Sequence, residues 1–420
     1  MKRIRQSITA TGKCIIEVLD LGNHMTYNEV LKAVKMADRN STVRSINLDF
    51  SKIYNYSFPN CIVPITGMVD YFKKVKESLP VAITSVKNKY LINTKLDHPT
   101  VITKSEISKN DESIFNRVWK FTNPSETKLI ADQLYRDVSQ KIECESGVIN
   151  AMSWCVNEIM DNTLRHSKTN VGFFMCQNHN HTKHLVFTIY DYGIGLYNSL
   201  YPSKYKPKSD IHAIELAMTK NVTRDTKEGQ GFGLWGLHQI IKLNDGILNI
   251  TSGSASYMMK NTQAKRNQYF DSVSYLSPSN GAVLIDFQLN YQNKINLNEV
   301  LVGGQYEAFQ ELLEEIEDIN GCLVFEIQDK SEGTGTRLAG AKVRNLIINI
   351  FKDTQQWILI DFKNVKYLTS SYADELLGKL IEQIGENVFV KRFRIKNLNE
   401  DLQDIVSYAM NERLKKNQSA

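Results

Sequence analysis

The hydrophobic and polar positions of the 420-residue chain follow two periods, one typical of strands and one typical of helices. Short apolar runs predict buried strands at 14–19, 45–50, 80–85, 184–190, 322–328 and 357–362. Longer segments with apolar residues every three or four positions predict helices at 27–37, 123–145, 152–166, 234–243 and 306–320. This alternation predicts the α/β fold class, and the length favours two or three domains.

The segment 152–166 places two polar side chains at the border of its apolar face. Glu158 and Asn162 are four residues apart, so a helix directs both toward one spot. A carboxylate and a carboxamide at that spacing could converge on a metal ion and a water. The alternative is an ordinary solvated helix edge.

The strand at 184–190 ends in a carboxylate followed by two glycines. Asp191 offers an acceptor, and Gly193 and Gly195 leave room for a flat ring to approach the backbone. An ordinary Asp-x-Gly turn is the alternative reading.

A second glycine motif, GQGFGL, precedes the helix at 234–243 and contains Gly229, Gly231 and Gly233. Glycines that lead into a helix expose backbone N–H groups to an anion, which is how helix starts bind phosphate. The motif is not a dinucleotide-binding unit, because no strand directly precedes it.

Together, NEIMDN, DYGIG and GQGFGL resemble the motifs of the GHKL superfamily of ATP-binding domains, over residues 121–292. The resemblance implies an α+β sandwich that binds ATP and Mg²⁺. It implies that Glu158 is the catalytic base, that Asn162 binds Mg²⁺ and that Asp191 accepts a hydrogen bond from adenine. It further implies nucleotide contacts from Gly193, Gly195, Gly229, Gly231, Gly233 and Leu234.

The 33 residues at 196–228, between the two glycine motifs, occupy the place of the ATP lid in that superfamily. Loops of this length are usually functional or mobile. An inner helix is expected at 210–220, capped by Ser209 or Asp210. Arg224 is the candidate basic residue that reaches the nucleotide, and simple solvation is the alternative.

The C-terminal region 300–415 contains a strand, a helix, a second strand, a Ser-Ser loop and a helix. This order resembles the STAS-like fold of anti-sigma-factor antagonists. The resemblance implies a phosphoacceptor at Ser370, although Thr369 stands where that family usually has Asp. The alternative is that Thr369, Ser370 and Ser371 only cap the following helix.

The N-terminal region 1–115 contains an echo of this segment. INLDFSKIYNYSFPN parallels ILIDFKNVKYLTSSY, with Asp49 opposite Asp361 and Phe58 opposite Ser370. We interpret the region as a possible degenerate STAS-like copy that lacks the acceptor. Chance similarity between two buried strands is the alternative.

The composition of the chain argues against several classes of partner, metal site and location. A net charge of +5, from 51 basic and 46 acidic residues, argues against nucleic acid as the main partner. The six cysteines show no metal-binding spacing, and His179, His181 and His184 stand in a loop without carboxylates. No signal peptide or membrane span is apparent, so a cytoplasmic location is expected.

These features favour a serine/threonine kinase of the anti-sigma-factor type, acting on a STAS-like partner or on its own Ser370. The alternative is an ATP-gated switch or ATPase of a signalling or defence system. A sensor histidine kinase and a gyrase-like clamp are disfavoured, because no membrane segment precedes the domain and no transducer domain follows it. Partners are expected to bind through the STAS-like domains, and homodimerisation is left open.

Overall fold

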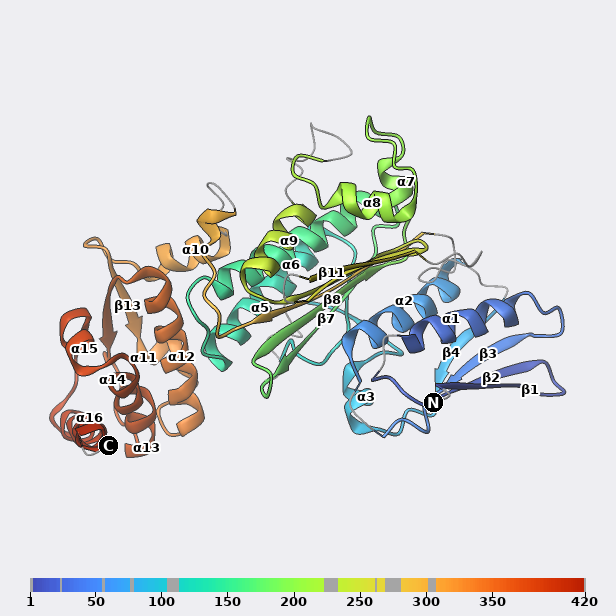
Figure 1. Ribbon diagram of the computed structural model, residues 1–420. Coiled ribbons are helices and arrows are strands. Elements are labelled where there is room, and N and C mark those ends of the chain that lie inside the picture. Colours follow the sequence, from blue (N-terminus) through green and yellow to red (C-terminus); the bar gives the residue numbers. More distant parts are fainter. Residues whose placement is uncertain are drawn as a thin grey trace. The chain divides into compact units, whose positions relative to one another are not determined.

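The computed structural model describes residues 3–22, 25–54, 57–75, 79–103, 113–222, 233–260, 263–268, 281–300 and 307–418. The chain forms two compact units, one of residues 1–133 with 154–293 and one of residues 134–153 with 294–420. Both units mix helices and strands (Figure 1), which confirms the predicted α/β class. The finer division into domains 1–115, 121–292 and 300–415 stays a prediction.

The first unit begins with a four-stranded sheet in the order β1-β2-β3-β4. Its strands are β1 (Ile4–Ile8), β2 (Lys13–Val18), β3 (Ser45–Asp49) and β4 (Val81–Thr84). Strands β2, β3 and β4 run parallel, connected by α1 (Met25–Asp38) and α2 (Pro59–Val75). Alternate residues of β2 and β3 are buried, as expected when one face of a sheet carries the core.

The same unit contains an eight-stranded sheet in the order β11-β10-β9-β12-β8-β7-β6-β5. The strands are β5 (Thr100–Val101), β6 (Trp119–Phe121), β7 (Gly172–His179), β8 (His184–Asp191), β9 (Ile247–Ser252), β10 (Ala255–Lys260), β11 (Gln263–Gln268) and β12 (Val283–Asn290). The helices of this part of the chain are α3 (Lys89–Thr94), which precedes β5, and α5 (Pro124–Lys141), α6 (Val148–His166), α7 (Gly195–Leu200), α8 (Asp210–Ala217) and α9 (Gly233–Leu243). Ser209 caps α8 by accepting from the His212 N–H, as predicted.

Helices cover both faces of this sheet. Figure 1 shows α6 and α9 together on one face, where the helices approach so closely that a Cβ on Gly236 would lie 2.4 Å from the Trp154 ring. Helix α2 packs on the opposite face, against β7 and β8. A Cβ on Gly67 of α2 would lie 2.3 Å from the Tyr190 ring, so the glycine permits this close packing.

The second unit is built on a parallel three-stranded sheet, β13-β14-β15. Its strands are β13 (Cys322–Glu326), β14 (Trp357–Asp361) and β15 (Phe393–Lys396). Its helices are α10 (Glu307–Ile316), α11 (Ile327–Lys330), α12 (Arg337–Thr354), α13 (Ser370–Ala373), α14 (Lys379–Ile384), α15 (Glu386–Arg392) and α16 (Glu400–Gln418), with a 3₁₀ turn at Leu297–Glu299. A π-helical turn, Asp374–Gly378, lies between α13 and α14, and such turns occur often at functional sites.

The loop between α5 and α6 belongs to this second unit. Asn349 of α12 is buried, donates to the carbonyls of Ser139 and Ile142, and accepts from the Cys144 N–H. These bonds satisfy backbone groups that the helix ends leave without partners. They explain why the end of α5 and the start of α6 cluster with the C-terminal region.

Candidate functional site

Helix α6 carries the predicted Glu158 and Asn162. Most of its apolar residues, among them Cys155, Val156 and Ile159, are buried, which fixes the orientation of the helix. The Asn162 Nδ2 atom lies 3.5 Å from the Glu158 Oε1 atom, so the two side chains converge as the spacing predicted. Burial, and then the Asp161 carboxylate, raise the pKa of Glu158. A carboxylate with a raised pKa is suited to taking up a proton.

The start of α9 lies against this pair. A Cβ on Gly233 would stand 2.6 Å from both the Glu158 Oε1 and Asn162 Nδ2 atoms, so only glycine fits there without displacing them. The last glycine of GQGFGL therefore lies against the Glu-x-x-x-Asn pair, although the two motifs are far apart in the sequence. Leu234 is the second residue of α9 and is half-buried. Gly229, Gly231 and Arg224 lie outside the described residues, and their roles stay predictions.

Asp191 ends β8 and is almost completely buried. Burial raises the pKa of its carboxyl to about 7, while a hydrogen bond from the Gly193 N–H, at 2.8 Å, opposes that change. A Cβ on Gly193 would lie 2.3 Å from the Ser167 carbonyl oxygen, and Gly195 has a φ of +76°. Both positions therefore require glycine. The structure shows this loop as a tight backbone turn around the carboxylate.

The predicted phosphoacceptor lies at the start of α13. Thr369 caps the helix by accepting from the Tyr372 N–H, and Ser370 is exposed at the first helical position. Thr369 is thus the residue whose side chain caps the helix, as the alternative interpretation of this loop predicted for Thr369. Modification of Ser370 stays a prediction.

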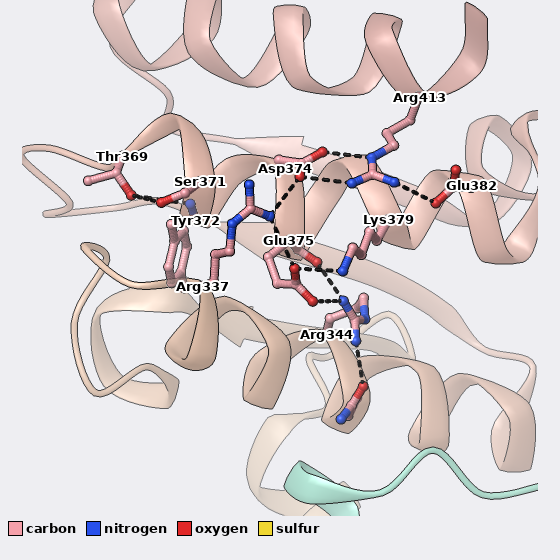
Figure 2. Close-up of polar contacts among 11 residues, drawn as sticks. Arg337, Arg344, Thr369, Ser371, Tyr372, Asp374, Glu375, Lys379, Glu382 and Arg413 are labelled. Carbon is pink, nitrogen blue, oxygen red and sulfur yellow. Dashed lines mark hydrogen bonds and ion pairs between the residues drawn. The ribbon is translucent and has the colours of Figure 1, made fainter. Parts of the chain in front are cut away.

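A network of charged side chains around the π-helical turn was not predicted from the sequence (Figure 2). Its buried centre is the pair Arg344 and Glu375, whose Nη1 and Oε1 atoms are 2.5 Å apart. Burial raises the pKa of Glu375, but hydrogen bonds from Lys379 and Arg344 outweigh it, and the net pKa is lowered. Such a network keeps a buried charge compensated.

The outer part of the network holds Asp374. Its carboxylate accepts from Arg413 at 2.7 and 2.9 Å and from Arg337 at 3.0 Å. The Arg413 hydrogen bonds, reinforced by Arg337, lower the pKa of Asp374 to about 2. The partners come from α12, the π-helical turn and α16, so no local spacing in the sequence could have indicated them.

Among the residues that the structure describes, no group of three or more His, Cys, Asp or Glu side chains is placed to bind a metal ion. Within the same residues, no helix is both long enough and apolar enough to cross a bilayer.

Comparison with protein families gives a match over residues 339–403, to the model described as a STAS-like domain of unknown function, DUF4325. The match covers most of α12, β14, the π-helical turn and β15, and it confirms a STAS-like domain in the C-terminal region. A comparison with curated proteins finds no match. The family comparison gives no match to a GHKL domain, so the resemblance of residues 121–292 to that superfamily stays a prediction from the sequence motifs.

Proposed function

We propose that the chain is a Mg-ATP-dependent regulatory protein that transfers phosphate to a serine of a STAS-like domain, on a partner or at its own Ser370. The observation that carries this proposal is the meeting of Glu158, Asn162 and Gly233 at one point. A base, an oxygen ligand and a helix start preceded by glycines are the groups that phosphoryl transfer requires.

The residues fit a bound Mg-nucleotide. The backbone at Gly233 lies against Glu158 and Asn162, since a Cβ there would stand 2.6 Å from both side chains, so the start of α9 is next to the pair. Asn162 would hold the metal ion, which neutralises charge on the phosphates during transfer. The buried carboxylate of Asp191, beside the close-packed Gly193, would accept a hydrogen bond from the adenine amino group.

Glu158 would act on the attacking hydroxyl group. In transfer to serine, the side-chain oxygen forms a bond to the γ-phosphorus, the bond to the bridging oxygen breaks, and ADP leaves. The hydroxyl proton passes to the Glu158 carboxylate, whose raised pKa favours holding it.

An ATP-gated switch is the second candidate function. The same residues would then direct water to the γ-phosphate, and the released product would be free phosphate. The fate of the γ-phosphate, on protein or in solution, separates the two functions.

The test compares two substitutions in the full-length chain. Glu158→Ala is expected to keep ATP binding and to lose turnover, by about 100-fold or more, because it removes the base. Asn162→Ala is expected to weaken binding only when Mg²⁺ is present. Equal turnover in Glu158→Ala and the parent would reject the assignment of the base.

A further inference from the structure

Ser370 and Asp374 lie on one helical face. The Asp374 N–H donates to the Ser370 carbonyl oxygen, so the turn between them is α-helical although a π-helical turn follows. Residues four apart in such a turn present neighbouring side chains, about 5 to 6 Å apart at Cβ. The exposed Ser370 hydroxyl therefore stands one turn from the Asp374 carboxylate.

Two arginines bind the Asp374 carboxylate, and they differ in how many contacts they make and in how exposed they are. Arg413 binds Asp374 through two nitrogens and also contacts Glu382 at 3.2 Å, and its side chain is 19% exposed. Arg337 has one nitrogen at 3.0 Å from Asp374 and 3.5 Å from Glu375, and its side chain is 58% exposed. Figure 2 shows Arg337 between Asp374 and the start of α13. Arg337 can therefore change partner at small cost.

The network contains one more cationic side chain than carboxylates. Its ion pairs join four cationic side chains to three carboxylates: Arg337, Arg344, Lys379 and Arg413 to Asp374, Glu375 and Glu382. When Arg337 leaves, Asp374 keeps Arg413, and Glu375 keeps Arg344 and Lys379. No carboxylate is left without a cation.

We propose that Arg337 is the binding residue for a phosphate on Ser370, exchanging Asp374 for the phosphoryl oxygens once the serine is modified. This inference rests on the proposed function. A phosphoserine carries nearly two negative charges and three acceptor oxygens, which repel Asp374 and match the planar fork of a guanidinium.

The exchange has a structural consequence at this edge of the domain. The loops before α12 and α13 already touch, because Thr369 donates through its N–H to the Thr334 carbonyl and through its hydroxyl to the Gly335 carbonyl. Arg337 is the first residue of α12, so a bond to phosphate adds a charged bridge between the two helix starts. Phosphorylation of Ser370 would therefore make the loops before α12 and α13 more ordered.

The test uses the full-length chain with phosphoserine incorporated during translation at position 370. Phosphorus NMR follows the titration of the phosphate in this protein, in Arg337→Gln and in Lys379→Gln. Lys379 is the matched control, since it is a cation of the same network paired with Glu375. We expect a second phosphate pKa about 0.5 to 1 lower in the parent than in Arg337→Gln, because a guanidinium favours the dianion. Lys379→Gln should resemble the parent.

The outcomes are distinct. An unchanged phosphate pKa in Arg337→Gln overturns the inference, and so does an equal rise in Lys379→Gln, because the effect would then belong to the whole network. Since phosphoserine is built in during translation, the result does not depend on kinase activity. If Mg-ATP leaves Ser370 unmodified but the Arg337 effect is present, the proposed transfer to the chain's own Ser370 fails and the binding role of Arg337 stands.

Discussion

The N-terminal sheet and the sheet of the STAS-like domain have the same arrangement of parallel strands, but the helices that follow them differ. In both, three parallel strands are joined through helices, and the middle strand ends in an aspartate whose Oδ1 accepts from the N–H two residues later, at 2.8 Å. These aspartates are Asp49 and Asp361, the pair that the sequence echo aligned. The correspondence thus extends from a short sequence window to the order and direction of the strands.

The difference lies in the helices that follow. In the register that aligns Asp49 with Asp361, the buried Ile62 and Val63 stand opposite Asp374 and Glu375. Helix α2 is therefore apolar enough to pack on the eight-stranded sheet, whereas its counterpart carries ion pairs. The same arrangement of strands is thus followed by a helix that packs on another sheet in the N-terminal region. In the STAS-like region it is followed by a charged network beside an exposed serine.

The largest expected effect comes from removing Arg344, the buried cation of the charged network in the STAS-like region. Arg344→Met leaves Glu375 with less compensation in a buried site and should cost about 3 kcal/mol of unfolding free energy, measured by urea denaturation. Lys32 stands at the aligned position and is exposed, so Lys32→Met should change stability by less than about 0.5 kcal/mol. Equal losses would contradict the contrast between the two regions.

The next effect concerns the packing region. Gly67→Ala places a Cβ 2.3 Å from the Tyr190 ring, so α2 must shift, and a loss of about 1 to 3 kcal/mol is expected. Gly335→Ala in the other region meets no atom within 4 Å and serves as the control. Unfolding curves for both variants test this, and a neutral Gly67→Ala would show that α2 is not tightly packed.

A smaller effect depends on pH. The pKa of Asp374 is lowered to about 2, below its unfolded value of about 3.9. Its stabilisation is therefore complete above about pH 4 and is lost as the pH falls through 2. The difference in unfolding free energy between the parent and Asp374→Asn should shrink over that window. A difference independent of pH would remove Asp374 from the network.

The smallest effect tests the shared turn. Asp49→Ala loses one backbone hydrogen bond and should cost about 1 kcal/mol. Asp361→Ala also loses a bond from Asn397, at 2.7 Å, and should cost somewhat more. Calorimetric melting of the two variants gives the comparison, and a stabilising change in either would contradict the role assigned to the turn.

Local patterns in the sequence predicted much of the fold. The buried strands β2, β3, β8, β13 and β14 and the helices α6 and α9 were predicted, because their apolar periods are set by burial on one face. The convergence of Glu158 and Asn162 also followed from helical spacing alone.

Features built from distant residues could not be predicted. Arg344 and Glu375 are 31 residues apart, and Arg413 and Asp374 are 39 apart, so no window of the sequence connects them. The contact between α2 and β8 depends on Gly67, which looks like any glycine inside an apolar helix until Tyr190 is placed against it. Tertiary packing decides such pairs.

The most direct test of the account is peptide mass spectrometry of the full-length protein after incubation with Mg-ATP, with free phosphate assayed in the same sample. We predict phosphate on the peptide that contains Ser370, or free phosphate if the switch is correct, and neither product in Glu158→Ala. A product that forms equally in Glu158→Ala, or no product together with no ATP binding by the parent, would contradict the central claim that Glu158, Asn162 and Gly233 form a nucleotide site.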